Sequence, residues 1–214
     1  MLTVKSFTFG PFQENTYVLH DASNECVIID PGCYTSSEQQ ELKKYIAENN
    51  LKPVELLNTH CHIDHITGNR FVHDAFGLLP VIHKNDLVIL QSQERVCTNY
   101  GLNYDPSPMP GKFIEEGDVI SFGNSILKVI FAPGHAPGHV VFYNAENKFV
   151  INGDVLFAGS IGRTDLPMGD FATLEKSIKT KMYTLPEETV VYCGHGPETS
   201  IGEEKYTNPF VNLN

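Results

Sequence analysis

The sequence is most distinctive in Thr59-His60-Cys61-His62-Ile63-Asp64-His65, which holds three imidazoles and one carboxylate. An apolar run at residues 54–57 precedes it and predicts a short buried strand. Because side chains alternate along a strand, His60 and His62 share a face that excludes Cys61. The last two residues of the stretch are adjacent, so the chain has to turn after His62 to bring both to one place. The stretch therefore predicts two ligand pairs side by side, which suits two metal ions.

Three further potential ligands each follow an apolar, strand-like run. They are His135 in Pro133-Gly134-His135-Ala136-Pro137-Gly138-His139, Asp154 in Asn152-Gly153-Asp154, and His195 in Cys193-Gly194-His195-Gly196. Strands would deliver all three to a common sheet edge. Neutral imidazole is the commonest metal ligand in proteins. A histidine-rich loop without metal is the simpler interpretation, and the density of the motif and its downstream partners argue against it.

Composition bounds the organisation of the chain. No charge run or low-complexity tract divides its 214 residues, so one domain spanning residues 1–214 is expected. The net charge of −11, with no cluster of lysine and arginine, argues against a nucleic-acid partner. The expected partner is a small molecule, and the oligomeric state is not given by the sequence.

The cysteines and the apolar runs suggest a compartment. Five cysteines form no paired framework, no run approaches a membrane span, and the N-terminus lacks a long apolar signal segment. We therefore expect no membrane association and a reducing, cytoplasmic location. Cys61 is expected to be a small buried side chain rather than a ligand.

The order of apolar patterns predicts an α/β protein. Strands open the chain at residues 2–9, 16–19 and 26–29, and the polar Gln13-Glu14-Asn15 reads as a turn. Clustered strands with interspersed helices suit two mixed β-sheets flanked by helices.

Helix signals are readable in three places. Ser36 and Ser37, with the glutamines at 39 and 40, offer a capping-box start. Asn85 or Asp86 is expected to cap a helix to about residue 97. Asp170 is expected to cap a helix whose buried face holds Phe171, Leu174, Ile178 and Met182. Residues 99–112 are too punctuated by proline and glycine for a regular element, and they form either a loop bordering the site or a plain surface excursion.

These motifs together resemble those of the metallo-β-lactamase superfamily, and the resemblance covers essentially the whole chain. Ser160-Ile161-Gly162-Arg163-Thr164-Asp165-Leu166-Pro167, Gly194-His195-Gly196-Pro197 and Asn208-Pro209-Phe210 look like the short bacterial glyoxalase II-like hydrolases. They resemble the related persulfide dioxygenases somewhat less. The resemblance implies the four-layer αβ/βα sandwich of the metallo-β-lactamase fold.

The resemblance also implies the ligands of two divalent metals, with zinc the first choice and iron or manganese the alternatives. The first metal would be held by His60, His62 and His135, the second by Asp64, His65 and His195, and Asp154 would bridge them. Asp64 and Asp154 are assigned to catalysis as well. The implied activity is cleavage of a thioester, such as a hydroxyacylglutathione, by attack of a metal-bound hydroxide.

Two alternatives remain beside this hydrolase. An iron-dependent persulfide dioxygenase would use a subset of the same residues, and a metal-binding scaffold without turnover ranks last. Zinc β-lactamases typically have Cys or Ser where this chain has Asp154, which argues against that activity.

Three residues are expected to support the ligands or the substrate. Arg163 is assigned to binding a substrate carboxylate, and an ion pair with Asp165 is an equal alternative that could coexist. His139 and Asp30 are expected to orient ligands through hydrogen bonds, against plain core or turn roles. Fewer residues follow His195 than in full-length glyoxalase II enzymes, so the carrier thiol is left open.

Overall fold

The computed structural model describes residues 2–213, which group into two compact units. The first unit contains the residues up to 114 together with 121–126, and the second contains residues 115–120 and those from 127 onward. The expectation of a single domain stays a prediction. Among the described residues, no helix is long and apolar enough to cross a membrane.

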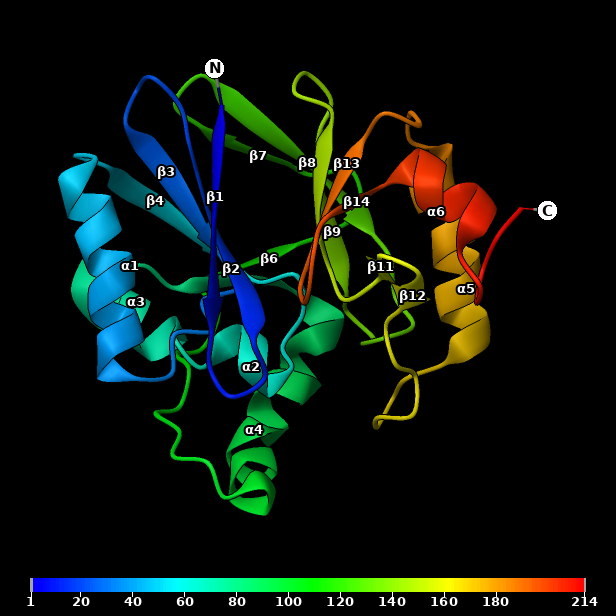
Figure 1. The fold of residues 1–214 in the computed structure, drawn as a ribbon. Helices are drawn as coiled ribbons and strands as arrows, with labels where there is room; N and C mark the ends of the chain where they lie inside the picture. Colours follow the sequence, from blue (N-terminus) through cyan, green and yellow to red (C-terminus); the bar gives the residue numbers. More distant parts are fainter. Residues whose placement is uncertain (1, 214) are drawn as a thin grey trace. The chain divides into compact units, whose positions relative to one another are not determined.

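The first unit is built on a mixed six-stranded sheet in the order β1-β2-β3-β4-β5-β6 (Figure 1). The first three strands pair antiparallel, and β3 to β6 continue in parallel. Its strands are β1 (Thr3–Phe9), β2 (Glu14–His20), β3 (Glu25–Ile29), β4 (Lys52–Leu57), β5 (Pro80–His83) and β6 (Lys112–Ile114). Its helices are α1 (Ser36–Glu48), α2 (Ile63–Ile66), α3 (Asn69–Phe76), η1 (Lys84–Asp86) and α4 (Leu87–Tyr100).

Two apolar clusters fix these helices on the first sheet. Leu42 and Ile46 of α1 and Val72 of α3 pack with strand residues such as Val18 and Leu56. A second cluster joins α2 and α4 to the β5 side chain Ile82, and it includes Cys61. Burial of these side chains supplies the main driving force for docking the helices. It also fixes the segment that follows β4, where the histidine motif lies.

The second sheet is also mixed and six-stranded, in the order β14-β13-β10-β9-β8-β7. Its strands are β7 (Val119–Phe122), β8 (Ser125–Phe131), β9 (Val140–Asn144), β10 (Phe149–Gly153), β13 (Val190–Cys193) and β14 (Thr199–Ser200). The other elements are the hairpin of β11 (Leu156–Phe157) and β12 (Ser160–Ile161), and α5 (Phe171–Thr180), η2 (Met182–Thr184) and α6 (Ile201–Thr207). β10 and β13 run parallel, whereas β9 with β10 and β13 with β14 are antiparallel. The expected pair of mixed sheets flanked by helices is confirmed.

Asp21 anchors the tip of the β7–β8 hairpin, which belongs to the first unit. Its carboxylate accepts hydrogen bonds from Asn124 N and Ser125 Oγ, both at 2.7 Å. It also accepts from Ser23 N at 2.9 Å and Ser23 Oγ at 2.6 Å. One buried carboxylate therefore organises two turns.

Three local predictions are wrong. Thr35 caps α1 and forms the capping box with Glu38, so the predicted caps Ser36 and Ser37 lie one and two residues too late. Phe171 is 46% exposed, although Leu174, Ile178 and Met182 are buried as expected. Glu14 begins strand β2 and is fully buried rather than lying in a turn.

Candidate metal-binding residues

The histidine motif lies at the carboxyl end of β4 in the first unit. After His62 the chain turns, as expected, and the turn is the short helix α2 with His62 at its N-cap. The helical turn carries Asp64 and His65 back toward His60. The His60 ring centroid lies 4.7 Å from that of His62 and 4.1 Å from that of His65. The four predicted ligands of this unit are therefore gathered on one segment.

The side chains of Asp86 and Asn58 hydrogen-bond to the backbone of the motif. The N–H of Cys61 donates to Asp86 Oδ2 at 2.5 Å, and the Asn58 side-chain amide donates to the carbonyl of His65 at 3.0 Å. Asp86 lies at the N-cap of α4 but makes no side-chain cap hydrogen bond, because its carboxylate is used on the motif. Cys61 packs in an apolar cluster, as the strand alternation predicts.

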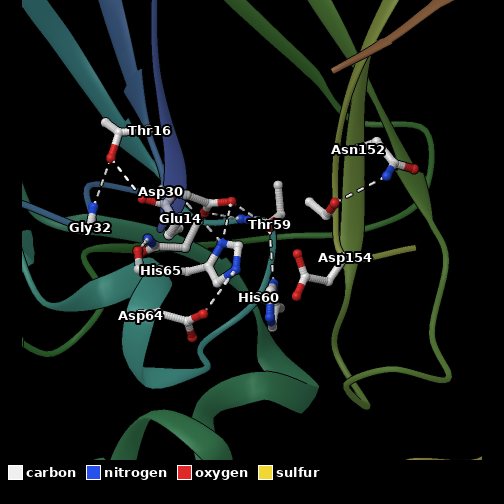
Figure 2. A network of polar contacts seen from close by, with 12 residues as sticks. Glu14, Thr16, Asp30, Gly32, Thr59, His60, Asp64, His65, Asn152 and Asp154 are labelled. Atoms are coloured by element: carbon white, nitrogen blue, oxygen red, sulfur yellow. Dashed lines mark hydrogen bonds and ion pairs between the residues drawn. The ribbon is translucent and has the colours of Figure 1, made fainter. Parts of the chain in front are cut away.

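Asp30 holds His65 and the start of the motif together (Figure 2). Its carboxylate accepts from Thr59 N at 2.7 Å, from Thr59 Oγ1 at 2.6 Å and from His65 Nδ1 at 3.1 Å. Because a carboxylate accepts here, Nδ1 carries the proton, and the lone pair of His65 is on Nε2. That atom lies 3.9 Å from Asp64 Oδ2.

The potential ligand atoms of Asp30, His60 and His65 lie within 4.8 Å of one another, which is close enough to bind one metal ion. The contact of Asp30 with Nδ1 argues that Asp30 orients His65 and does not share its ion.

Glu14 is a neighbour of His65 that sequence reasoning missed. Its Oε2 accepts from Thr16 Oγ1 at 2.8 Å, and its Oε1 lies 3.9 Å from His65 Nδ1. Burial raises the pKa of Glu14 well above its usual range, and nearby His65 acts in the opposite direction. Figure 2 shows Glu14 beside Asp30 and His65. No local pattern separates this glutamate from a surface one.

The second unit brings together His135, Asp154 and His195. Asp154 follows β10 and His195 follows β13, and these neighbouring strands are parallel, so both residues emerge at the same sheet edge. The Nε2 atoms of His135 and His195 lie 3.5 and 3.6 Å from the same atom, Asp154 Oδ2. Those distances are long for hydrogen bonds. Two ligands of one tetrahedral ion with bonds of about 2.0–2.2 Å are roughly 3.4 Å apart, so the spacing fits metal coordination.

Backbone contacts orient the ligands of this unit. His135 Nδ1 lies 2.8 Å from the carbonyl oxygen of Arg163, so Nδ1 donates and Nε2 is left for a metal. The N–H of Asp154 donates to His139 Nε2 at 3.0 Å. A Cβ at Gly162 would run into the Asp154 carbonyl, which accounts for glycine at this crossing.

The Arg163 side chain forms the predicted ion pair with Asp165. Arg163 Nε and Nη2 donate to the two carboxylate oxygens at 2.7 and 2.8 Å. This hydrogen bonding lowers the pKa of Asp165 to about 2. The Arg163 side chain remains 58% exposed. Its role in substrate binding stays a prediction, as does the union of the two ligand sets in one centre.

Comparisons with known proteins agree with these observations. A family model described as the metallo-beta-lactamase superfamily matches residues 9–195. A probable metallo-hydrolase of Bacillus subtilis, YqgX, is 39% identical over 204 residues, which cover 95% of this chain and 94% of that protein. The hydroxyacylglutathione hydrolase GloC of Haemophilus influenzae is 36% identical over 203 residues, covering 94% of each chain.

Solved structures show the same fold. BLEG-1, a B3 metallo-beta-lactamase, matches with a TM-score of 0.88 and 34% identity, over 98% of this chain and 99% of that one. TTHA1623 in a di-iron-bound form matches with a TM-score of 0.87 and 38% identity, over 97% and 100%. ETHE1 from Myxococcus xanthus matches with a TM-score of 0.80 and 26% identity, over 97% and 83%.

Proposed function

This chain belongs to the metallo-β-lactamase superfamily, and from that membership we propose that it is a metal-dependent hydrolase that cleaves a thioester such as a hydroxyacylglutathione. The observation that carries the proposal is the placement of His135 and His195 Nε2 around one oxygen of Asp154. The similarity to GloC supports the choice of a hydroxyacylglutathione-like substrate.

The donor set fits two divalent cations. We propose that His60, His62 and His135 hold one, that Asp64, His65 and His195 hold the other, and that Asp154 bridges them. When bound, the cations would supply hydroxide at neutral pH and a positive field for the substrate carbonyl oxygen. Zinc is our first choice of metal. The nitrogen and carboxylate ligands suit zinc, and they suit iron and manganese as well. The di-iron form of TTHA1623 keeps iron in consideration.

The protein's own residues would hold these ligands ready. Asp30 fixes the His65 tautomer, and the Arg163 carbonyl fixes that of His135, so each ring offers Nε2 without rearrangement. Asp64 and Asp154 are the carboxylates that we assign to the reaction, and each lies beside an imidazole Nε2. Such preorganisation removes a reorientation cost from the transition state.

A thioester requires no separate nucleophile or strong acid from the protein. A leaving thiol has a pKa of about 8.5, so it departs as thiolate near neutral pH. The cysteines are unsuited to nucleophilic attack, since burial raises the pKa of Cys193, two residues before His195, to about 12. This is consistent with a reaction in which hydroxide attacks the carbonyl directly.

Arg163 is proposed to bind a carboxylate of the carrier thiol. Its guanidinium already makes a bidentate pair with Asp165, and both side chains are largely exposed, at 58% and 69%. Exposed pairs of this kind are weak, so a substrate carboxylate can compete with Asp165. The proposed partner is a small molecule, and no nucleic-acid partner is proposed, as the sequence predicts. We also propose a cytoplasmic location, with which the absence of disulfides among the five cysteines is consistent.

The alternative is an iron-dependent persulfide dioxygenase, and the likeness to ETHE1 fits it. Such an enzyme would use one iron held by part of the same ligand set. The two activities differ in metal content, in oxygen consumption and in the bond broken.

The test combines metal analysis with three assays of the purified protein. We expect two metal ions per chain and hydrolysis of lactoylglutathione, without oxygen uptake on glutathione persulfide and without cleavage of a chromogenic β-lactam. One iron per chain with oxygen uptake and no thioester cleavage would establish the alternative instead.

The matched variants are Asp154→Asn and, as control, Glu146→Gln on the exposed β9–β10 turn. Asp154→Asn should lose metal and activity together, by about 100-fold or more in activity. Glu146→Gln removes the same charge from the same unit and should change neither. Full turnover by Asp154→Asn would exclude the bridging role.

A further inference from the structure

A buried carboxylate outside the ligand set joins two parts of the second unit. Glu204 lies in α6 and is 1% exposed. Its two carboxylate oxygens accept from Gly159 N at 3.1 and 3.0 Å, and Oε1 also accepts from Thr199 Oγ1 at 2.7 Å. Oε2 accepts from Asn208 Nδ2 at 2.7 Å. Every donor is a neutral group, and a buried charge is tolerated only when hydrogen bonds satisfy it in this way.

The donors come from segments that lead to the proposed ligands. Gly159 is the turn of the β11–β12 hairpin, which begins just after Asp154 and ends just before Arg163. Thr199 opens β14, four residues after His195. The side chain of Asn208, at the end of α6, additionally donates to the Ser160 carbonyl of the hairpin at 3.0 Å. The carboxylate thus ties the hairpin to the segment that carries His195.

The hairpin contacts His195, and the residues just after it contact His135. The Phe157 ring on β11 lies edge-on to the His195 ring, with centroids 6.3 Å apart and planes at 64°. At the other end of the hairpin, Gly162 N donates to the Val155 carbonyl at 3.3 Å. The next residue, Arg163, accepts from His135 Nδ1 through its carbonyl.

We propose that Glu204 is a positioning residue that fixes the β11–β12 hairpin against the His195 segment and thereby sets the orientation of His195. The carboxylate does not touch the reacting groups. It acts through Gly159 and Thr199 on Phe157 and the His195 backbone. The inference depends on the proposed function only for the role of His195 as a ligand, and its test reads the ring orientation itself, so the two can fail separately.

The test is nuclear magnetic resonance of the zinc-loaded full-length protein, with the chelated protein measured in parallel. The reporter is the set of His195 ring protons, which the Phe157 ring current shifts. Phe157→Ala removes the ring and gives the reference resonance positions without that contact. In Glu204→Gln the side-chain NH2 group faces N–H and O–H donors that the carboxylate accepted from. The variant should therefore move the His195 resonances toward their positions in Phe157→Ala. It should also accelerate exchange of the Gly159 amide hydrogen by about 5- to 30-fold.

Glu203→Gln is the matched control, because Glu203 is the exposed neighbour of Glu204 in α6. It should leave the His195 resonances and Gly159 exchange unchanged. Thr199→Val is the second variant, for use if Glu204→Gln does not fold. It keeps the Glu204 carboxylate and removes only the hydrogen bond from Thr199 Oγ1, in the segment that follows His195. This variant should shift the His195 resonances and leave Gly159 protected.

The proposal is overturned if folded Glu204→Gln leaves the His195 resonances at their wild-type positions, or if Thr199→Val does so where Glu204→Gln is unfolded. A uniform loss of amide protection across the second unit, with no specific change at His195, would also overturn it. That outcome would assign Glu204 to stability alone. As a functional readout, Glu204→Gln should weaken zinc binding by about tenfold, with Glu203→Gln unaffected.

Discussion

Replacing Asp30 by asparagine should destabilise the first unit far more than removal of an ordinary surface charge. The Asp30 carboxylate is 2% exposed and accepts three hydrogen bonds, two from Thr59 and one from His65. Asparagine has nearly the same shape but only one acceptor oxygen. Whichever way the amide is turned, its NH2 group faces at least one donor.

The cost follows from the donors left without an acceptor. If the amide oxygen takes the Oδ2 position, it keeps Thr59 Oγ1 and His65 Nδ1, and the buried Thr59 N–H is orphaned. An unsatisfied buried donor costs about 1–3 kcal/mol, and loss of the charge weakens the other two bonds, so about 2–4 kcal/mol is expected. For a chain of this length 1 kcal/mol shifts the melting temperature by about 2–4 °C, which gives a decrease of about 4–16 °C.

The assay is thermal unfolding of the metal-free protein, because bound metal would stabilise the native state and mask the change. Asp74→Asn is the control, since Asp74 is exposed on α3 of the same unit, and it should change stability by less than about 0.5 kcal/mol. If Asp30→Asn melts within about 2 °C of the wild type, the three hydrogen bonds do not have the assigned role.

Three further predictions concern other charged or thiol groups. Burial acts to raise the pKa of Asp21, but hydrogen bonds from Ser23, Ser125 and Asn124 outweigh it and hold that pKa well below its usual range. Its stabilising effect should therefore be complete above the unfolded pKa of about 4 and be lost as pH falls below it, so the difference in melting temperature between wild type and Asp21→Asn should shrink in acid. All five cysteines are buried and free, so a thiol reagent should label the native protein slowly and reach five thiols only in denaturant; fast native labelling would contradict the burial. Arg163→Ala should raise KM for lactoylglutathione with little change in kcat, whereas Lys181→Ala, which removes another ion-paired cation of the second unit, should change neither.

The proposed ligands could be predicted because their information is local. Imidazole and carboxylate side chains at the ends of apolar runs are visible in the sequence, and the spacing of His60 and His62 follows from strand geometry. The mixed sheets were also predictable, since strand and helix patterns differ in period. The boundaries were less so: α4 continues to Tyr100, three residues beyond the expected end, and the irregular segment begins only after it.

Other features depended on contacts that no local pattern contains. Thr35, the cap of α1, is an exception, because Thr35-Ser36-Ser37-Glu38 matches the local capping-box pattern that the prediction placed one residue later. The Glu14 side chain is buried beside His65, although the residue types around it are typical of a turn. The small elements β11, β12, β14 and α6 are too short for a periodic signal.

The buried carboxylates show why a sequence motif identifies ligands more readily than the residues that hold them. Asp30, Asp86 and Glu204 each accept a hydrogen bond from a backbone N–H of another segment. Asp64 and Asp154 instead place an oxygen 3.9 and 3.5 Å from an imidazole Nε2. All five are the same chemical group in the sequence, and only the identity of the approaching atom separates the two roles. A carboxylate that accepts from the backbone N–H of another segment holds the two segments together, whereas one facing Nε2 of an oriented imidazole is placed to share an ion with it. By this criterion the proposed positioning role of Glu204 and the proposed metal-binding role of Asp154 are distinguished by the atoms that approach each carboxylate.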